Sequence, residues 1–164
     1  MRALRAAGTA AIALLCAWAL WQWCVVPLRI DLAKPVLKQK TETVVRARNS
    51  AGAVPLARET AARIEILLAE DPYDIDLLLL LATNLEAAGR IEDAMAVVQR
   101  ALAVEPRPEL HFAASMLYLQ LGNLPAAIDS AEVAVRFKPV LVLQLSGELR
   151  NEVRRRLGMS PTKG

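Results

Sequence analysis

Apolar residues follow three different patterns along this 164-residue chain. From Ala6 to Leu28 no residue is charged, and about 20 apolar residues in a helix are enough to cross the ~30 Å core of a bilayer. From Ile75 to Pro139 one pattern of small and apolar positions occurs twice. From Val140 to Leu157 a one-sided stripe has an apolar residue at every fourth position: Leu141, Leu145, Leu149, Val153 and Leu157. These patterns predict an all-α chain with an N-terminal transmembrane helix, a repeat domain and a C-terminal capping helix.

The repeat between Ile75 and Pro139 predicts the architecture of the domain. Each copy is expected to form a helix, a turn that contains a glycine, a second helix and a closing proline. Corresponding residues are 33 positions apart: Gly89, Ala94, Val98, Ala101 and Pro106 recur as Gly122, Ala127, Ala131, Ala134 and Pro139. Self-similarity at this period is typical of a helical solenoid, in which one helix pair buries its apolar face only against its neighbours.

The repeated unit resembles the tetratricopeptide repeat (TPR), a helical hairpin of about this length. The signature of its first helix corresponds to Leu78, Leu81, Ala82 and Leu85, and then to His111, Ala114, Ser115 and Tyr118. Leu78 and His111 replace a family tryptophan, and the turn at 106–108 is one residue short. A half-repeat at 55–72, matched at Pro55, Leu56, Ile64, Leu67 and Pro72, precedes full repeats at 75–108 and 108–141. The resemblance implies a short TPR-like solenoid of about two and a half repeats, closed by a capping helix at 140–157.

The resemblance also implies a binding groove, because the first helix of each TPR lines the inner, concave face. The corresponding positions are Asp76, Leu79, Thr83, Glu86 and Ala87 in the first repeat, and Glu109, Phe112, Met116, Leu119 and Gln120 in the second. Such a groove is apolar with acidic edges. It fits an amphipathic helix or an extended apolar peptide, whose ends could be basic. In the alternative interpretation, the C-terminal helix or the connector covers Phe112 and Met116, which then belong to the core.

Leu79 and Thr83 have a further consequence for the expected client. In the members of the family that bind chaperones, these positions hold Lys and Asn side chains that grip the terminal carboxylate of a peptide. This chain has neither side chain there. A client bound through its terminal carboxylate is therefore not expected.

Charge divides the chain in the same way as hydropathy. Basic residues outnumber acidic ones in 1–52 and in 140–164, whereas acidic residues dominate 53–139. The sequence pI of 9.1 thus comes from the flanks and not from a basic face on the domain. Aromatic residues make up only 4% of the chain, so the interleaved basic and aromatic pattern of a nucleic-acid interface is absent, and no nucleic-acid partner is expected.

The N-terminal segment is interpreted as an uncleaved signal-anchor at 6–28, after a short basic tail at 1–5. Membrane-interface residues are expected at its far end: Trp18, Trp21, Trp23 and Arg29. Cleavage within Ala17-Trp18-Ala19 is the alternative, but it would leave an apolar N-terminus. Arg2 and Arg5 favour a cytoplasmic N-terminus in the inner membrane of a bacterium, with a periplasmic domain. The basic residues of the connector at 29–53 favour the opposite orientation.

Catalytic chemistry is not expected. His111 is the single histidine, and both cysteines, Cys16 and Cys24, lie within the predicted span. No glycine-rich phosphate loop or metal-binding motif occurs. We therefore expect no enzyme, no catalytic residue, no cofactor and no metal. Acidic residues gather where helices are expected to begin, and stabilisation of helix N-termini explains them better than acid–base catalysis.

Two functions remain open at this point. In the first, the chain is a membrane-anchored TPR adaptor that binds a protein client in the groove and aids assembly or maturation of a cell-envelope complex. In the second, it is a fixed accessory subunit of a membrane complex, held by the span and the connector. The expected partners are proteins and, through residues 6–28, the lipid bilayer, with no small-molecule substrate. Residues 54–157 form the expected domain, and 158–164 an expected disordered tail.

Overall fold

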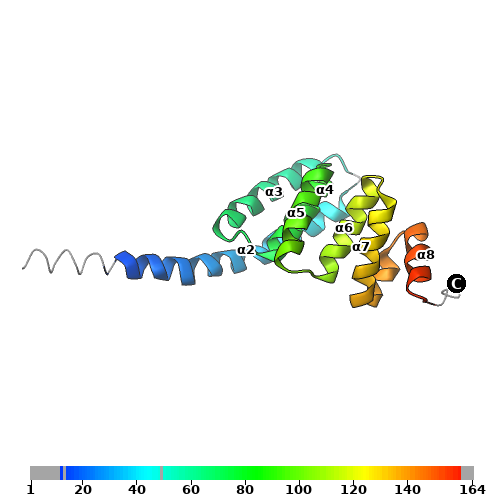
Figure 1. The fold of residues 1–164 in the computed structure, drawn as a ribbon. Coiled ribbons are helices and arrows are strands. Elements are labelled where there is room, and N and C mark those ends of the chain that lie inside the picture. The colour runs from blue at the N-terminus through cyan, green and yellow to red at the C-terminus, as the bar shows by residue number, and fades with distance from the viewer. Residues whose placement is uncertain (1–11, 13, 49, 160–164) are drawn as a thin grey trace, which may run out of the picture. The chain divides into compact units, whose positions relative to one another are not determined.

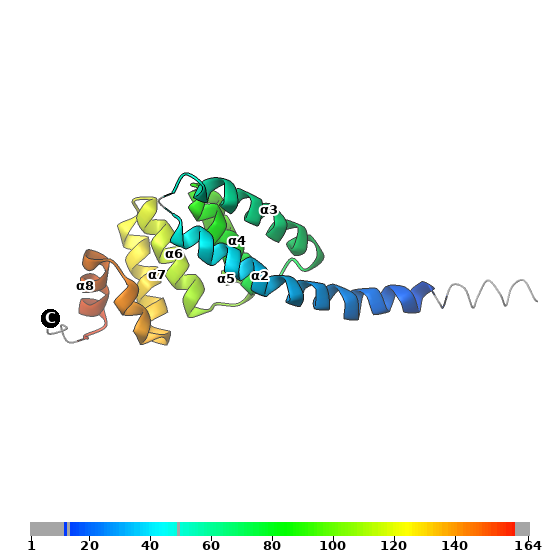
Figure 2. The same cartoon turned by 180° about the vertical axis from the view of Figure 1, so that it is seen from behind.

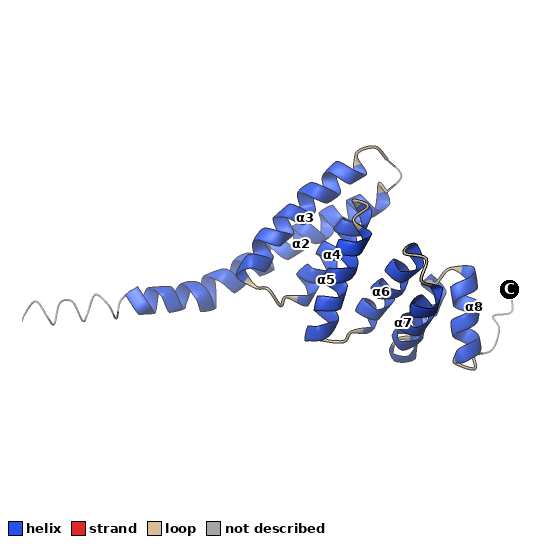
Figure 3. Cartoon of the chain, turned by 45° about the horizontal axis from the view of Figure 1, so that its top comes forward, coloured by secondary structure: helices blue, strands red, loops and turns tan. Residues whose placement is uncertain are grey.

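The computed structural model describes residue 12 and residues 14–48 and 50–159 (Figure 1). All regular secondary structure in this part of the chain is helical (Figure 3). The chain divides into two compact units, residues 1–39 and residues 40–164, which are described separately. Helix α2 (Val26–Arg46) contains the boundary between them.

The first unit exposes large apolar side chains along its helical residues. A π-helical turn, η1 (Trp21–Val25), precedes α2. The side chains of Trp18, Trp21 and Trp23 are exposed. The guanidinium carbon of Arg29 lies 6.0 Å from the centroid of the Trp21 ring, at the limit of a cation–π contact.

The predicted membrane location is wrong. Residues 1–5 of the predicted tail and residues 6–11 and 13 of the predicted span lie outside the described residues. Within the described ranges, no helix is both long enough and apolar enough to cross a bilayer. Helix α2 has 21 residues, but charged residues such as Arg29, Asp31 and Lys34 occur from its first turn onwards. The single-pass inner-membrane anchor with a periplasmic domain, and the expected lipid contact of residues 6–28, are therefore not supported.

The second unit is a stack of helices (Figures 1 and 3). After the end of α2 come α3 (Ala53–Glu70), α4 (Ile75–Ala87), α5 (Ile91–Val104), α6 (Pro108–Gln120) and α7 (Leu124–Phe137). Each helix from α3 to α7 packs against the next one in the chain. A 3₁₀ helix, η2 (Pro139–Gln144), and α8 (Gly147–Arg156) follow, and both pack against α7. Figure 2 shows α3 and α8 at opposite ends of this stack. The prediction of an all-helical repeat solenoid is confirmed.

Glycines and small residues form the repeated hairpins. Gly89 and Gly122 have φ angles of 79° and 74°, a left-handed conformation that glycine adopts without a steric penalty. Each ends its helix with the same bonding pattern: the amide of Arg90 donates to the carbonyl of Leu85, and that of Asn123 to Tyr118, both at 2.9 Å. Ala94, Ala101, Ala127 and Ala134 are fully buried, so the repeat positions with the smallest side chains lie where helices pack together. Pro106 and Pro139 are exposed at the ends of the two repeats.

The C-terminal segment differs from the single helix expected at 140–157. Leu145 has an extended conformation (φ −72°, ψ 148°), which separates η2 from α8. The side chain of Arg150 donates to the carbonyl of Leu143 at 3.1 Å and to the carbonyl of Leu145 at 2.7 Å, and so satisfies acceptors that the break leaves free. The apolar stripe still serves as core: Leu141, Leu145, Leu149 and Val153 join the buried face of α7 in one cluster. Residues 160–164 of the predicted tail lie outside the described residues.

Candidate protein-binding surface

Two polar contacts link α4 and α6, the helices that carry the predicted groove residues. Near their C-terminal ends, the Nε2 atom of Gln120 donates to Oε1 of Glu86 at 2.6 Å. Near their N-terminal ends, the Nη1 atom of Arg107 donates to Oδ1 of Asp76 at 3.3 Å. We call the predicted positions the α4–α6 surface: Asp76, Leu79, Thr83, Glu86, Ala87, Glu109, Phe112, Met116, Leu119 and Gln120. Polar contacts between the helices thus mark both ends of this surface.

The apolar side chains of the α4–α6 surface are neither fully exposed nor fully buried. Leu79, Phe112, Met116 and Leu119 are all half-buried. Phe112 and Leu119 pack against the cluster formed by α7, η2 and α8, so these two side chains also contribute to the core. Thr83 donates its hydroxyl to the carbonyl of Leu79 at 2.9 Å, within its own helix. The surface between the polar ends therefore offers mainly hydrocarbon to a partner.

The acidic residues of this surface are already paired. Oε1 of Glu86 accepts from Nη2 of Arg48 at 3.0 Å as well as from Gln120. Oε1 of Glu109 accepts from the Nζ atom of Lys138 at 2.6 Å, and this bond lowers the pKa of the Glu109 carboxyl. Asp76 shares Arg107 with Glu105, whose pKa Arg107 lowers. The edges are therefore closer to neutral than the acidic side chains alone indicate.

The cations of these ion pairs were missed by the sequence interpretation. Arg107 follows Pro106, and Lys138 precedes Pro139, so a basic residue beside each closing proline was the signal available. Arg48 lies 38 residues before its partner Glu86, in the predicted connector. No repeat spacing links Arg48 to the groove, and only the fold brings it to Glu86.

The end of α2 packs beside α4 through a buried polar contact. The side chains of Thr41 and Asn84 are 5% and 0% exposed. The Nδ2 atom of Asn84 donates to Oγ1 of Thr41 and to the carbonyl of Leu80, both at 2.8 Å. Its Oδ1 atom is buried and accepts no hydrogen bond. Lys40 also forms an ion pair with Glu59 of α3 at 3.4 Å. Residues 40–48 therefore belong with the repeats rather than forming a free spacer.

His111 lies half-buried on α6, and burial lowers the pKa of its imidazole. It is therefore mostly neutral at pH 7. Among the described residues, no three side chains of the metal-binding types come close enough to hold an ion.

Comparisons with known proteins agree with this geometry. Residues 46–117 match the family model of the tetratricopeptide repeat. A crystal structure of the Yersinia enterocolitica type III secretion translocator chaperone SycD, in an alternative dimer, has a TM-score of 0.53 and 20% identity over 76% of this chain and 94% of that one. A second SycD structure has a TM-score of 0.52 and 20% identity over 81% and 96% of the two chains.

A type III secretion complex from Aeromonas hydrophila gives a TM-score of 0.52 and 20% identity over 81% of this chain and 85% of that one. No curated protein sequence matches the chain. At 20% identity these likenesses concern the fold alone. The family match covers α3, α4, α5 and most of α6, and it includes the first of the two glycine turns, at Gly89.

Proposed function

We propose that this chain is a protein-binding adaptor that holds a segment of a client protein on its α4–α6 surface. The observation that carries the proposal is the arrangement of this surface, with half-buried apolar side chains between two polar contacts that join α4 to α6. Apolar side chains that are not needed to fill a core are a common feature of protein-binding sites. The proposal does not include a membrane anchor.

The comparisons support the class of function. Tetratricopeptide repeats are scaffolds that expose a surface to other proteins. The proteins of similar fold include one described as a type III secretion translocator chaperone. Because a fold hosts many functions, the proposal rests on the chemistry of the surface, and the likeness supports only its general class.

The proposed client segment is apolar and needs no strong positive charge. Asp76, Glu86 and Glu109 already have cationic or amide partners, so they attract a basic peptide less than free carboxylates do. An amphipathic helix or an extended apolar strand is the recognition mode that such a surface fits. Leu79 and Met116 are the proposed apolar contacts, because they lie on neighbouring helices between the two polar ends.

The test places a charge on the surface without disturbing the buried core. Leu79→Glu and Met116→Glu are each made in the full chain, and a protein partner is isolated with the wild type and purified. We expect either variant to weaken binding about tenfold or more, because the new carboxylate is desolvated against an apolar segment. Phe112 is avoided, since it also packs against the C-terminal cluster.

Ile66→Glu is the matched control, because Ile66 is an apolar residue of α3 that is 65% exposed and lies outside the surface. Circular dichroism and the unfolding midpoint establish that all three variants fold. Equal binding by folded Met116→Glu, Leu79→Glu and wild-type protein would contradict the proposal. So would equal losses in the control and the surface variants.

A further inference from the structure

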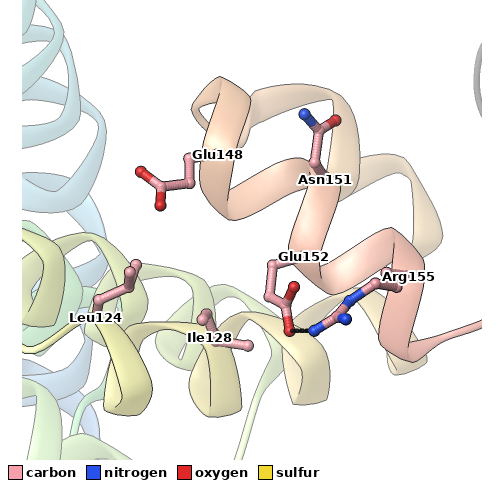
Figure 4. Close-up of a pocket in the computed structure, with 6 residues that line it drawn as sticks. All are labelled: Leu124, Ile128, Glu148, Asn151, Glu152 and Arg155. Carbon is pink, nitrogen blue, oxygen red and sulfur yellow. Dashed lines mark hydrogen bonds and ion pairs between the residues drawn. The ribbon is translucent and has the colours of Figure 1, made fainter.

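A pocket of about 320 Å³ lies between α7 and α8, away from the α4–α6 surface (Figure 4). Leu124 and Ile128 of α7 form its apolar floor, and Glu148, Asn151, Glu152 and Arg155 of α8 line the opposite side. In Figure 4, Leu124 and Ile128 lie on α7 below α8, and a dashed line joins Glu152 to Arg155. An apolar floor with a few polar groups above it is the usual composition of a ligand site.

The repeat pattern shows where this pocket lies in the solenoid. Leu124 and Ile128 occupy the positions that Ile91 and Met95 occupy in α5, 33 residues earlier. After α5 the chain continues with α6, a helix of 13 residues, whereas after α7 it continues with η2 and then α8, which has only 10. Leu124 is half-buried and Ile128 is buried, as their counterparts Ile91 and Met95 are, so the difference between the two places is the shorter helix that follows α7.

Helix α8 divides its faces between core and pocket. Leu149 and Val153 are buried in the C-terminal cluster. The four pocket residues Glu148, Asn151, Glu152 and Arg155 have the i, i+3, i+4, i+7 spacing of a single helix face. This polar face therefore lies beside the uncovered part of α7 and forms one wall of the pocket.

One charge in the pocket has no partner. Arg155 donates to Glu152 at 2.6 Å, so these two side chains neutralise each other. Glu148 is exposed and makes no hydrogen bond or ion pair with any side chain in the described part of the chain; the same holds for Asn151. The pocket thus combines an apolar floor with an unpaired carboxylate and an unpaired amide.

We propose that this pocket binds a segment of a partner protein in which a large aliphatic side chain adjoins a Lys or Arg. The aliphatic side chain contacts Leu124 and Ile128, and the cation pairs with Glu148. Charge complementarity determines this choice, because an acidic segment would meet the unpaired carboxylate and a purely polar one would leave the floor uncovered. The site would be a second contact for a client, independent of the α4–α6 surface.

The experiment is a titration of the ¹⁵N-labelled full chain with short peptides, followed by amide chemical shifts. The probe is the acetylated, amidated peptide Ala-Leu-Lys-Ala. The controls are the same peptide with Glu in place of Lys, and with Ser in place of Leu. We expect saturable shifts at Leu124, Ile128, Glu148 and Asn151 with the probe only, and weaker binding as salt is raised.

Substitutions then assign the two contacts. Glu148→Gln should weaken binding of the probe about threefold, which corresponds to the contribution of one exposed ion pair to the binding free energy. The affinity of this variant for the probe should no longer depend on salt. Glu92→Gln is the matched control, since Glu92 is an exposed acid in the first turn of α5, as Glu148 is in α8. Leu124→Ala should weaken binding of the probe further. Absence of saturable shifts, equal binding of the Glu peptide, or an unchanged affinity in Glu148→Gln would overturn the proposal.

Discussion

At the scale of single residues, the two turn glycines show how directly the backbone limits the sequence. A side chain at Gly89 or Gly122 would meet no atom within 4 Å, so space does not require glycine there. The positive φ angles are the reason for glycine, because a Cβ atom in the left-handed region crowds the neighbouring backbone.

Gly122→Ala should therefore lower the free energy of unfolding by about 1 kcal/mol. Gly52→Ala is the matched control, because Gly52 has a φ angle of −83° and equally open surroundings. It should be neutral or slightly stabilising, since alanine restricts the unfolded chain. Urea unfolding of both variants measures the difference. Equal stability of the two would exclude backbone strain as the reason for glycine at position 122.

His111 should make stability depend on pH between about 7.5 and 5.5. Burial places its folded-state pKa below the ordinary value of 6.5. As pH falls through 6.5, the unfolded chain binds the proton more readily than the folded one, so the free energy of unfolding decreases. The Glu109 carboxyl contributes little in this window, because Lys138 holds its pKa below 4.5.

Replacement of this imidazole tests the assignment. In His111→Gln, the free energy of unfolding should change little between pH 7.5 and 5.5. Below pH 5.5 it should fall as in the wild type, because carboxylates become protonated there. Urea unfolding at several pH values measures both parts. An unchanged slope in His111→Gln would assign the dependence to another group.

At the scale of elements, the sequence predicts the helices that repeat better than the segment that ends the stack. Gly89, Gly122 and the buried alanines define two hairpins through local rules, and the structure forms both. The break at Leu145 depends on a contact from Arg150, five residues later, to carbonyl groups that only the folded segment presents. Periodicity alone cannot distinguish this arrangement from a continuous helix, because the leucines of the stripe are buried in either case.

Arg150→Ala should therefore loosen the attachment of α8. The lost bonds to the carbonyls of Leu143 and Leu145 should cost about 1–2 kcal/mol, the range for a bond from a charged donor in partly exposed surroundings. Hydrogen exchange should increase in α8 more than in α4. Arg58→Ala is the control, because Arg58 is an exposed residue of α3 and has no side-chain partner among the described residues. Equal exchange in the two variants would contradict this role of Arg150.

At the scale of the whole molecule, the sequence predicts the helical solenoid correctly and the membrane location wrongly. The uncharged run at residues 6–28 predicts a membrane span. In the structure, the end of this run belongs to helix α2, which also contains charged residues. Glu86 of α4 and Gln120 of α6 contact each other, while the ion pairs at these helices join residues 29 to 38 apart. Pairs so far apart in the sequence form because of how the helices stack, and no local sequence pattern predicts them.

The last prediction concerns where the helical unit begins. Val44 is fully buried, Thr41 bonds to Asn84, and Arg48 bonds to Glu86, so the segment before α3 contributes to packing against α4. A chain that starts at Lys40 should therefore unfold in one cooperative step. A chain that starts at Ala53 should lose about 3 kcal/mol, from the exposure of one aliphatic contact and the loss of a buried hydrogen bond that leaves Asn84 with a single partner. Circular dichroism during urea unfolding measures both chains. Equal stability would show that the repeats are complete without residues 40–52, and the buried Thr41–Asn84 contact would then need another explanation.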